Sequence, residues 1–216
     1  MKKYKHIIWD WNGTLFDDVE LCHNIINRLL IRNEIEKISL QRYREIFDFP
    51  VKKYYQSAGL DFNKTSFEIL GKEFMDEYEE RKFESTVFNE AKDVLESVLL
   101  LGITQSVLSA YHHDSLVKIT EHFGIKDYFI DLNGLDNIYA ASKIDIGKKW
   151  IKKSGYKKGE VVLIGDTIHD FEVAEAIGAD SILIAGGHQT KERLSKCGVP
   201  VYDNLSSLKP ELLNNR

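Results

Sequence analysis

The sequence has few of the residues that are typical of chains stabilised by disulfides or metal ions rather than by an apolar core. Its two cysteines, Cys22 and Cys197, lie far apart and form no C-x-x-C pair, so neither a disulfide framework nor a zinc site is expected. Three prolines and 14 glycines argue against a disordered or fibrous chain. With 43% hydrophobic and 29% charged residues among 216, the chain is expected to form one globular domain, or one domain with a smaller insert.

Long apolar runs and an excess of positive charge are also lacking. No apolar run approaches the roughly 20 residues needed to cross a bilayer, and the first ten residues, MKKYKHIIWD, contain too short an apolar stretch for a signal peptide. Lys and Arg total 29 against 34 Asp and Glu, a formal net charge of −5, which gives no net attraction to phosphate backbones or anionic lipid. We therefore expect a cytoplasmic protein that binds neither nucleic acid nor a membrane.

Hydrophobic patterning divides the chain into a helical part and an alternating part. Residues 6–9 form a short apolar run that ends at Asp10, which predicts a buried strand. Helical patterns follow at about 18–31, 40–47, 51–58 and 64–83, with Asp17 and Glu20 spaced as in a capping box and no convincing strand before Phe88. Beyond it, strands are expected at 103–108, 128–132, 161–164, 181–184 and 199–202, and helices at 91–101, 114–123, 142–154 and 168–177.

This alternation predicts βαβ units and a parallel sheet, with the earlier helical stretch as an inserted module. In open parallel sheets, ligands bind beyond the carboxyl ends of the strands. The polar residues expected there are Asp10, Ser109, Lys143 and Asp166. Asp10, Ser109 and Lys143 each have an ordinary structural explanation when taken alone, as a turn or cap residue or as a solvated lysine. Thr167 and Asp170 likewise have the spacing of a capping box, but that box does not account for Asp166, an acid one glycine past a buried strand.

Together these residues indicate phosphoryl transfer. Two carboxylates that meet at one sheet edge need a cation between them, and oxygen ligands of this kind suit Mg²⁺, which also binds substrate phosphate. A carboxylate can attack phosphorus to form an aspartyl phosphate. Hydroxyls and a lysine can hold the oxygens of the transferring group.

On these residues the sequence resembles the haloacid dehalogenase-like hydrolase superfamily, and within it the phosphoglycolate phosphatase-like branch with a helical cap. The family pattern D-x-D-G-T-L-x-D is similar to DWNGTLFD at 10–17, and G-D-x-x-x-D is similar to GDTIHD at 165–170. Ser109 in VLSA and Lys143 match weaker signals between them. The resemblance implies an α/β fold, a Rossmann-like doubly wound parallel sheet formed by residues 1–16 and 89–216, with an α-helical cap domain at 17–88.

The resemblance also implies roles for the matched residues. Asp10 is the expected nucleophile of a Mg²⁺-dependent phosphatase acting on a small phosphorylated metabolite, as a monomer or homodimer. The expected metal ligands are Asp10, Asn12 through its backbone carbonyl, and Asp166, with Asp170 supporting the metal's waters. The expected phosphate contacts are Thr14, Ser109 and Lys143, and Lys143 also neutralises Asp10. The cap is expected to exclude water and to choose the substrate.

Asn12 departs from the family pattern, in which the second acid protonates the leaving group and then activates water. An amide cannot do this near neutral pH, and general acid–base catalysis is typically worth roughly 10²–10⁴-fold. The backbone carbonyl survives the change, so metal binding is expected to survive too. His112, His113 and His169 are the candidate substitutes for the missing proton carrier.

Two alternatives stay open at this point. The first is a catalytically weak phosphate-binding or regulatory protein, which Asn12 alone supports. The second is a metal-independent hydrolase acting at carbon, which leaves Asp166 and Asp170 without a purpose.

Overall fold

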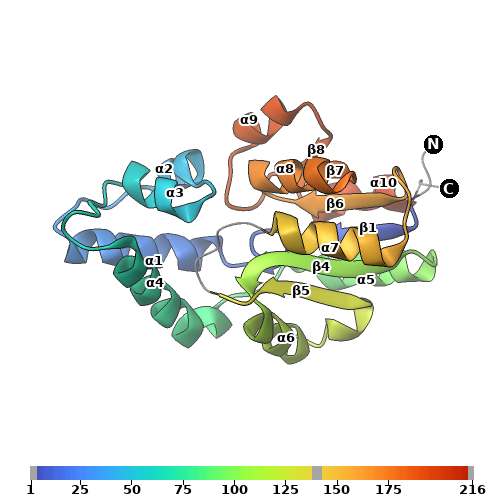
Figure 1. Ribbon diagram of the computed structural model, residues 1–216, viewed down its shortest axis with the longest axis horizontal. Coiled ribbons are helices and arrows are strands. Elements are labelled where there is room, and N and C mark those ends of the chain that lie inside the picture. Colours follow the sequence, from blue (N-terminus) through green and yellow to red (C-terminus); the bar gives the residue numbers. More distant parts are fainter. Residues whose placement is uncertain (1–3, 138–142, 214–216) are drawn as a thin grey trace.

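The computed structural model describes residues 4–137 and 143–213 (Figure 1). In these ranges, six strands form one parallel sheet in the order β5-β4-β1-β6-β7-β8, and two short strands, β2 and β3, pair separately. The strands are β1 (His6–Trp9), β2 (Phe16–Asp17), β3 (Thr86–Val87), β4 (Thr104–His112), β5 (Asp131–Leu135), β6 (Val161–Gly165), β7 (Asp180–Ile184) and β8 (Val201–Tyr202). The α-helices are α1 (Val19–Arg32), α2 (Leu40–Ile46), α3 (Val51–Ser57), α4 (Phe67–Arg81), α5 (Ala91–Leu100), α6 (His113–His122), α7 (Ile144–Ser154), α8 (Ile168–Ile177), α9 (Lys191–Leu194) and α10 (Leu205–Leu213).

β1 lies at the centre of the sheet and is buried on both faces. Ile8 packs in a cluster with Trp150 of α7 and Val173 of α8, whereas Ile7 and Trp9 belong to a larger cluster that includes residues of α5, α6 and α10. β1 pairs with β4 on one side and with β6 on the other. This is the place where the strand order reverses, so the carboxyl end of β1 opens on the crevice in which such sheets bind ligands. The predicted α/β fold is confirmed.

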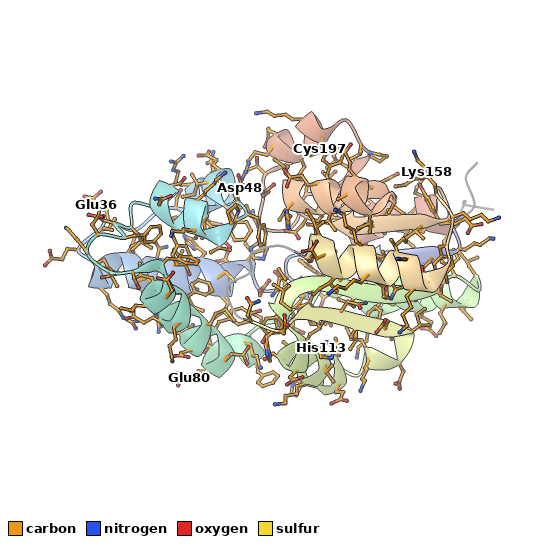
Figure 2. All side chains as sticks on the ribbon, viewed as in Figure 1. Glu36, Asp48, Glu80, His113, Lys158 and Cys197 are labelled. Atoms are coloured by element: carbon orange, nitrogen blue, oxygen red, sulfur yellow. The ribbon has the colours of Figure 1, made fainter. Side chains whose placement is uncertain are left out.

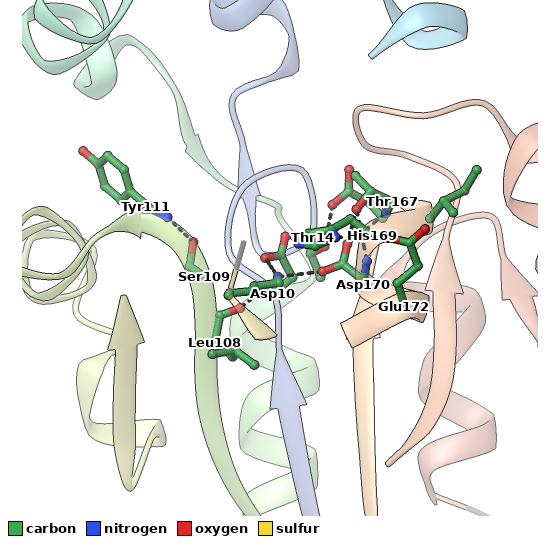
Figure 3. Close-up of polar contacts among 12 residues, drawn as sticks. Asp10, Thr14, Leu108, Ser109, Tyr111, Thr167, His169, Asp170 and Glu172 are labelled. Atoms are coloured by element: carbon green, nitrogen blue, oxygen red, sulfur yellow. Dashed lines mark hydrogen bonds and ion pairs between the residues drawn. The ribbon is translucent and has the colours of Figure 1, made fainter. Parts of the chain in front are cut away.

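The helices α1–α4, here called the helical module, lie beside the sheet at the end toward which its strands point (Figures 1 and 3). The chain leaves and re-enters the sheet through the antiparallel pair of β2 and β3, in which Phe16 is opposite Val87. The sequence predicted no strand here, because two-residue strands are too short to show a period-two pattern. None of the described helices is long and apolar enough to cross a bilayer.

Several predicted boundaries were wrong for local reasons. β4 does not end at Ser109 but continues to His112, and its register with β5 shifts between Leu108 and His112. β5 begins only at Asp131, because a 3-10 turn occupies 126–128. The predicted helix at 142–154 is α7, with Lys143 at its N-cap; residue 142 itself lies outside the described residues. The short helices after β7 and β8 were not predicted.

The two predicted capping boxes had opposite outcomes. The box at Thr167 and Asp170 is present at the start of α8. The box at Asp17 and Glu20 is wrong, because the N-cap of α1 is Asp18, and its side chain makes no capping hydrogen bond. The Asp18 carboxylate instead bonds with groups near the end of β1.

Candidate active site

Three carboxylates meet at the carboxyl ends of β1 and β6. Asp10 follows β1 directly, and its backbone N–H donates to the Ile164 carbonyl of β6 at 2.8 Å. Asp166 follows β6, and Asp170 lies in the first turn of α8. Carboxylate oxygens of Asp10, Asp166 and Asp170 lie within 4.8 Å of one another, and all three residues are buried. Figure 3 shows Asp10 and Asp170 facing each other above the strand ends.

Lys143 brings one buried ammonium to these carboxylates. Its Nζ contacts Asp10 Oδ1, lies 2.6 Å from Asp170 Oδ1 and donates to the Leu108 carbonyl at 3.0 Å. Burial alone would lower the pKa of Lys143, but the charges of Asp10 and Asp170 outweigh it and raise that pKa. Burial raises the pKa of Asp10 well above its usual value, although Lys143 opposes this. In Asp170 the ammonium prevails over burial and lowers the carboxyl pKa.

Asp166 is held by hydrogen bonds and enclosed by glycines. Its Oδ1 accepts from the Thr14 hydroxyl at 2.9 Å, and its Oδ2 accepts from the His188 backbone N–H at 2.6 Å. Burial raises the pKa of Asp166 to about 6. A Cβ at Gly13, whose φ is +72°, would lie 2.4 Å from Asp166 Oδ2, and one at Gly187 would lie 2.1 Å from it. Only glycine lets both loops pass this carboxylate.

The donor set fits a hard divalent cation. Three carboxylates face one lysine ammonium, so their negative charge exceeds what Lys143 balances. All three donors are oxygens, the ligand type that Mg²⁺ takes in proteins. A divalent cation here would offset the repulsion and burial that raise the pKa values of Asp10 and Asp166.

The predicted phosphate contacts lie in different surroundings. Ser109 is buried, lines the cavity described below, and accepts the Tyr111 backbone N–H at 3.0 Å (Figure 3). The Thr14 hydroxyl donates to Asp166, while its distance to Asp10 Oδ2 is 3.5 Å. The structure therefore turns Thr14 toward the candidate metal ligands.

The side chain of Asn12 is held by a second buried carboxylate. Its Nδ2 lies 2.7 Å from Asp18 Oδ2 and 2.8 Å from the Tyr78 hydroxyl of α4. Asp18, which is 0% exposed, also accepts from the Gly13 N–H at 3.1 Å and from the Tyr78 hydroxyl at 2.8 Å. Although burial acts to raise it, the pKa of Asp18 is lowered by hydrogen bonds from its neighbours, His188 foremost. Asn12 therefore serves as a donor to an ionised carboxylate.

His188, in the loop after β7, was missed by the sequence analysis. Its Nε2 lies 3.3 Å from Asp18 Oδ1, and its Nδ1 is 2.7 Å from the Tyr43 hydroxyl of α2. Burial opposes charging, but Asp18 raises the pKa of this imidazole above its usual value. The signal that points to it is its position, because this loop follows the carboxyl end of β7 just as Asp166 follows that of β6.

The three histidines proposed as proton carriers are not equivalent. His169 is buried and lines the cavity, and its Nε2 has no hydrogen-bond partner among the described residues. His112 is the N-cap of α6 and His113 its first residue (His113 is labelled in Figure 2), and neither is among the described residues that line the cavity. Of these three histidines, His169 is thus the one that lines the cavity; His188 lines it too, with its two ring nitrogens in contact with Asp18 and Tyr43.

A cavity of about 140 Å³ extends from the carboxylates into the helical module. Its wall on the sheet side includes Asp10, Ser109, Lys143 and Asp170. Its wall on the module side includes the half-buried apolar side chains Phe47, Phe49, Val51, Phe67, Phe74 and Met75. One end of the cavity is therefore strongly polar, and the other is apolar.

Comparisons with known proteins agree with this geometry. The family model described as "Haloacid dehalogenase-like hydrolase" matches residues 7–184. A curated relative, a phosphoglycolate phosphatase from Vibrio parahaemolyticus serotype O3:K6 (strain RIMD 2210633), is 26% identical over 126 residues, which are 57% of this chain and 55% of the relative. The match thus spans only about half of that relative's length.

Two solved structures cover nearly the whole chain. A predicted phosphatase from Clostridium acetobutylicum is 20% identical with a TM-score of 0.83, covering 98% of this chain and 99% of that one. A haloacid dehalogenase-like family hydrolase from Streptococcus pneumoniae is 17% identical with a TM-score of 0.84 and the same coverage. At this level of identity, the likeness shows the fold.

Proposed function

Because the chain belongs to the haloacid dehalogenase-like hydrolase family, we propose that it hydrolyses phosphate monoesters of small molecules, with Mg²⁺ as cofactor and Asp10 as nucleophile. The observation that carries this proposal is the Lys143 ammonium, which lies between Asp10 and Asp170 beside a third buried carboxylate. Such a site offers a phosphoryl group a carboxylate oxygen, and Lys143 together with a bound divalent cation would attract the phosphoryl oxygens. Residues 17–88 form the cap in this proposal.

Each residue has a distinct task in the proposed reaction. Asp10 attacks phosphorus, so that an aspartyl phosphate forms and the ester oxygen leaves with its electron pair. Lys143 and the Ser109 hydroxyl hold the phosphoryl oxygens, and Lys143 favours the ionised form of Asp10 against the effect of burial. The residues that would hold the cation are Asp10, Asp166 and the Asn12 carbonyl, with Asp170 and Thr14 supporting them. When bound, Mg²⁺ supplies positive charge for the transferring phosphoryl group.

The experiment is a phosphate-release assay on a panel of small phosphate monoesters, with Mg²⁺ and with a chelator. We expect release that depends on Mg²⁺ and is abolished by Asp10→Asn, because an amide is a poor nucleophile toward phosphorus. Circular dichroism of Asp10→Asn checks that the fold is retained. Activity that is indifferent to the chelator, or that persists in Asp10→Asn, contradicts the proposal.

One observation favours the second candidate, a weakly catalytic phosphate-binding protein. Both contacts of the Asn12 amide are made with Asp18 and Tyr78, and no carboxyl stands at position 12 to move a proton. This candidate predicts binding of a phosphorylated ligand without turnover at high enzyme concentration, which the same panel measures.

A further inference from the structure

The module wall of the cavity is suited to an uncharged, apolar leaving group. Phe49, Phe74 and Met75 are apolar yet only half-buried, because they face the cavity. Among the described residues that line it, Lys143 is the only lysine or arginine, and its ammonium already pairs with Asp10 and Asp170. A second anion on the substrate, such as a carboxylate, would be buried there without a counter-charge from the module.

The size of the cavity, its polar end included, limits the leaving group to a single aromatic ring. Its volume is about 140 Å³. An engineered apolar cavity of about 150 Å³ in another protein stays dry and binds benzene. An aromatic ring also stacks well against the aromatic side chains that form this wall.

Tyr54 adds one polar atom to this wall. The residue is 2% exposed and lines the cavity, and its hydroxyl has no hydrogen-bond partner among the described residues. Its own ring packs edge-on against the rings of Tyr43 and Tyr55, with centroids at 5.7 Å and 5.6 Å. Buried hydroxyls are normally hydrogen-bonded, so a ligand atom is the natural partner of this one.

The lack of an acidic side chain at position 12 also favours a phenol, because a phenol can leave without being protonated. When an Asp10 oxygen bonds to phosphorus, the ester P–O bond breaks and its electron pair stays on the leaving oxygen. The Asn12 amide is not acidic enough to protonate a leaving oxygen, and it donates hydrogen bonds to Asp18 and Tyr78. A phenol, with a pKa near 10 like that of tyrosine, leaves as an anion far more readily than an aliphatic alcohol, whose pKa is near the value of about 16 for water.

We propose that the substrate is an aryl phosphate, the phosphate monoester of a single-ring phenol that carries one neutral polar substituent within reach of Tyr54. This inference rests on the proposed function and narrows its substrate class. A phenolate needs no proton from Asn12, His169 or His188 in order to leave, and it takes one from water. A water molecule then attacks the phosphorus of the aspartyl phosphate, the bond to the Asp10 oxygen breaks, and inorganic phosphate is released.

Three esters distinguish the effect of the apolar cavity on KM from the effect of leaving-group acidity on kcat. Phenyl and cyclohexyl phosphate are similar in size and apolar, but differ in leaving-group pKa, so phenyl phosphate is expected to have a kcat about 100-fold higher or more. Cyclohexyl phosphate and phosphoglycolate both have aliphatic leaving groups, so the apolar wall is expected to give the former a KM at least about tenfold lower. A kcat/KM for phosphoglycolate equal to or above that for phenyl phosphate overturns the inference.

Two variants on the same helix test the wall itself. Phe74→Ala is expected to raise KM for phenyl phosphate about tenfold or more, with a smaller effect on inhibition by inorganic phosphate. Ile69→Ala is the matched control, because Ile69 also lies on α4 but is 53% exposed and does not line the cavity. Equal effects of the two variants on the KM of phenyl phosphate contradict a role for the wall.

Tyr54→Phe removes one oxygen and keeps the ring. Among the 2-, 3- and 4-hydroxymethyl derivatives of phenyl phosphate, one is expected to have a KM about two- to tenfold below that of phenyl phosphate itself. This advantage is expected to disappear in Tyr54→Phe. If no isomer has a lower KM than phenyl phosphate, or if Tyr54→Phe retains the difference, the Tyr54 hydroxyl does not bind the polar substituent of the substrate.

Binding of phosphonates distinguishes a failure of this inference from a failure of the proposed function. Phenylphosphonate and phosphonoacetate cannot be hydrolysed, and calorimetry measures their binding to the Mg²⁺-loaded protein and to the metal-free protein. Phenylphosphonate binding at least tenfold tighter supports the aryl-selective cavity even if no ester is hydrolysed. Equal or weaker binding of phenylphosphonate overturns it, even if hydrolysis by Asp10 is demonstrated.

Discussion

Replacing Asn12 by aspartate tests the contact between positions 12 and 18. Asn12→Asp would place two carboxylate oxygens at the distance of 2.7 Å that now separates Asn12 Nδ2 from Asp18 Oδ2. At an effective dielectric constant of about 20, two unit charges that close repel by about 6 kcal/mol. Uptake of a proton limits this cost, because protonating a carboxyl of pKa near 4 at pH 7 takes about 4 kcal/mol. The free energy of unfolding is therefore expected to fall by up to about 4 kcal/mol at pH 7.

The pH dependence of this loss follows from the same proton. In the folded variant, one carboxyl pKa is raised above its unfolded value near 4, so the folded state binds more protons than the unfolded state at neutral pH. Relative to the parent protein, the variant therefore gains stability as the pH falls, by about 1.4 kcal/mol per pH unit, and the deficit nearly vanishes by pH 4.

The exchanged pair, Asn12→Asp with Asp18→Asn, restores one amide and one carboxylate and reverses the hydrogen bond between them. Urea unfolding of the parent, both single variants and the double variant at pH 5 and pH 7 gives the coupling, which we expect to exceed about 2 kcal/mol at pH 7. The double variant is also expected to raise cyclohexyl phosphate turnover by about 10²-fold. Intact mass must first exclude deamidation of Asn12, which precedes Gly13. An Asn12→Asp variant as stable as the parent at both pH values, with no coupling, refutes this reasoning.

Three further changes test the site and the sheet. Mg²⁺ at 100 times its dissociation constant is expected to stabilise the protein by about 2.7 kcal/mol, seen as a rise in Tm that Asp166→Ala removes; an equal rise in both proteins excludes Asp166 as a ligand. Lys143→Met leaves Asp10 and Asp170 without their ammonium, so urea unfolding at pH 7 is expected to show a loss of about 3–5 kcal/mol, and an unchanged midpoint would contradict the ion pairs. Burial lowers the pKa of the His6 imidazole to about 3, so below about pH 6.5 only the unfolded chain takes up its proton and stability falls by about 1.4 kcal/mol per pH unit. His6→Gln is expected to reduce this acid slope between pH 6 and pH 4, and an identical slope in the variant would show that other groups cause it.

The arrangement of the sheet and its carboxylates was predictable because short-range patterns specify them. Apolar runs interrupted by Asp10 and Asp166 predicted strands that end at acids, and parallel pairing brings those ends to one edge. The capping-box spacing likewise predicted the start of α8, and Asp170 proves to have two partners, the α8 N-terminus and Lys143.

The surroundings of Asn12 were not predictable, because they depend on contacts between distant segments. Tyr78 and His188 come within hydrogen-bonding range of Asp18 from positions 60 and 170 residues further along the chain. From the sequence alone, Asp18 marks the start of a helix, and nothing local indicates that its carboxylate faces Asn12. The apolar cavity is similar, since Phe49 lies between two helical patterns and Phe74 within a later one, and they meet only in the folded module.

The loop between β7 and α9 connects the helical module with the proposed cation site. Gly187 accepts a hydrogen bond from Arg44 at 3.1 Å, and Gln189 donates to the Phe47 carbonyl at 2.9 Å, so the loop is bound to the helical module. Between them, the His188 backbone N–H holds Asp166. A displacement of the module would therefore pull on the residue proposed to bind the cation, and the dependence is reciprocal, because any coupling between two equilibria acts equally in both directions. A position of the module that favours cation binding should consequently be favoured in turn by the bound cation.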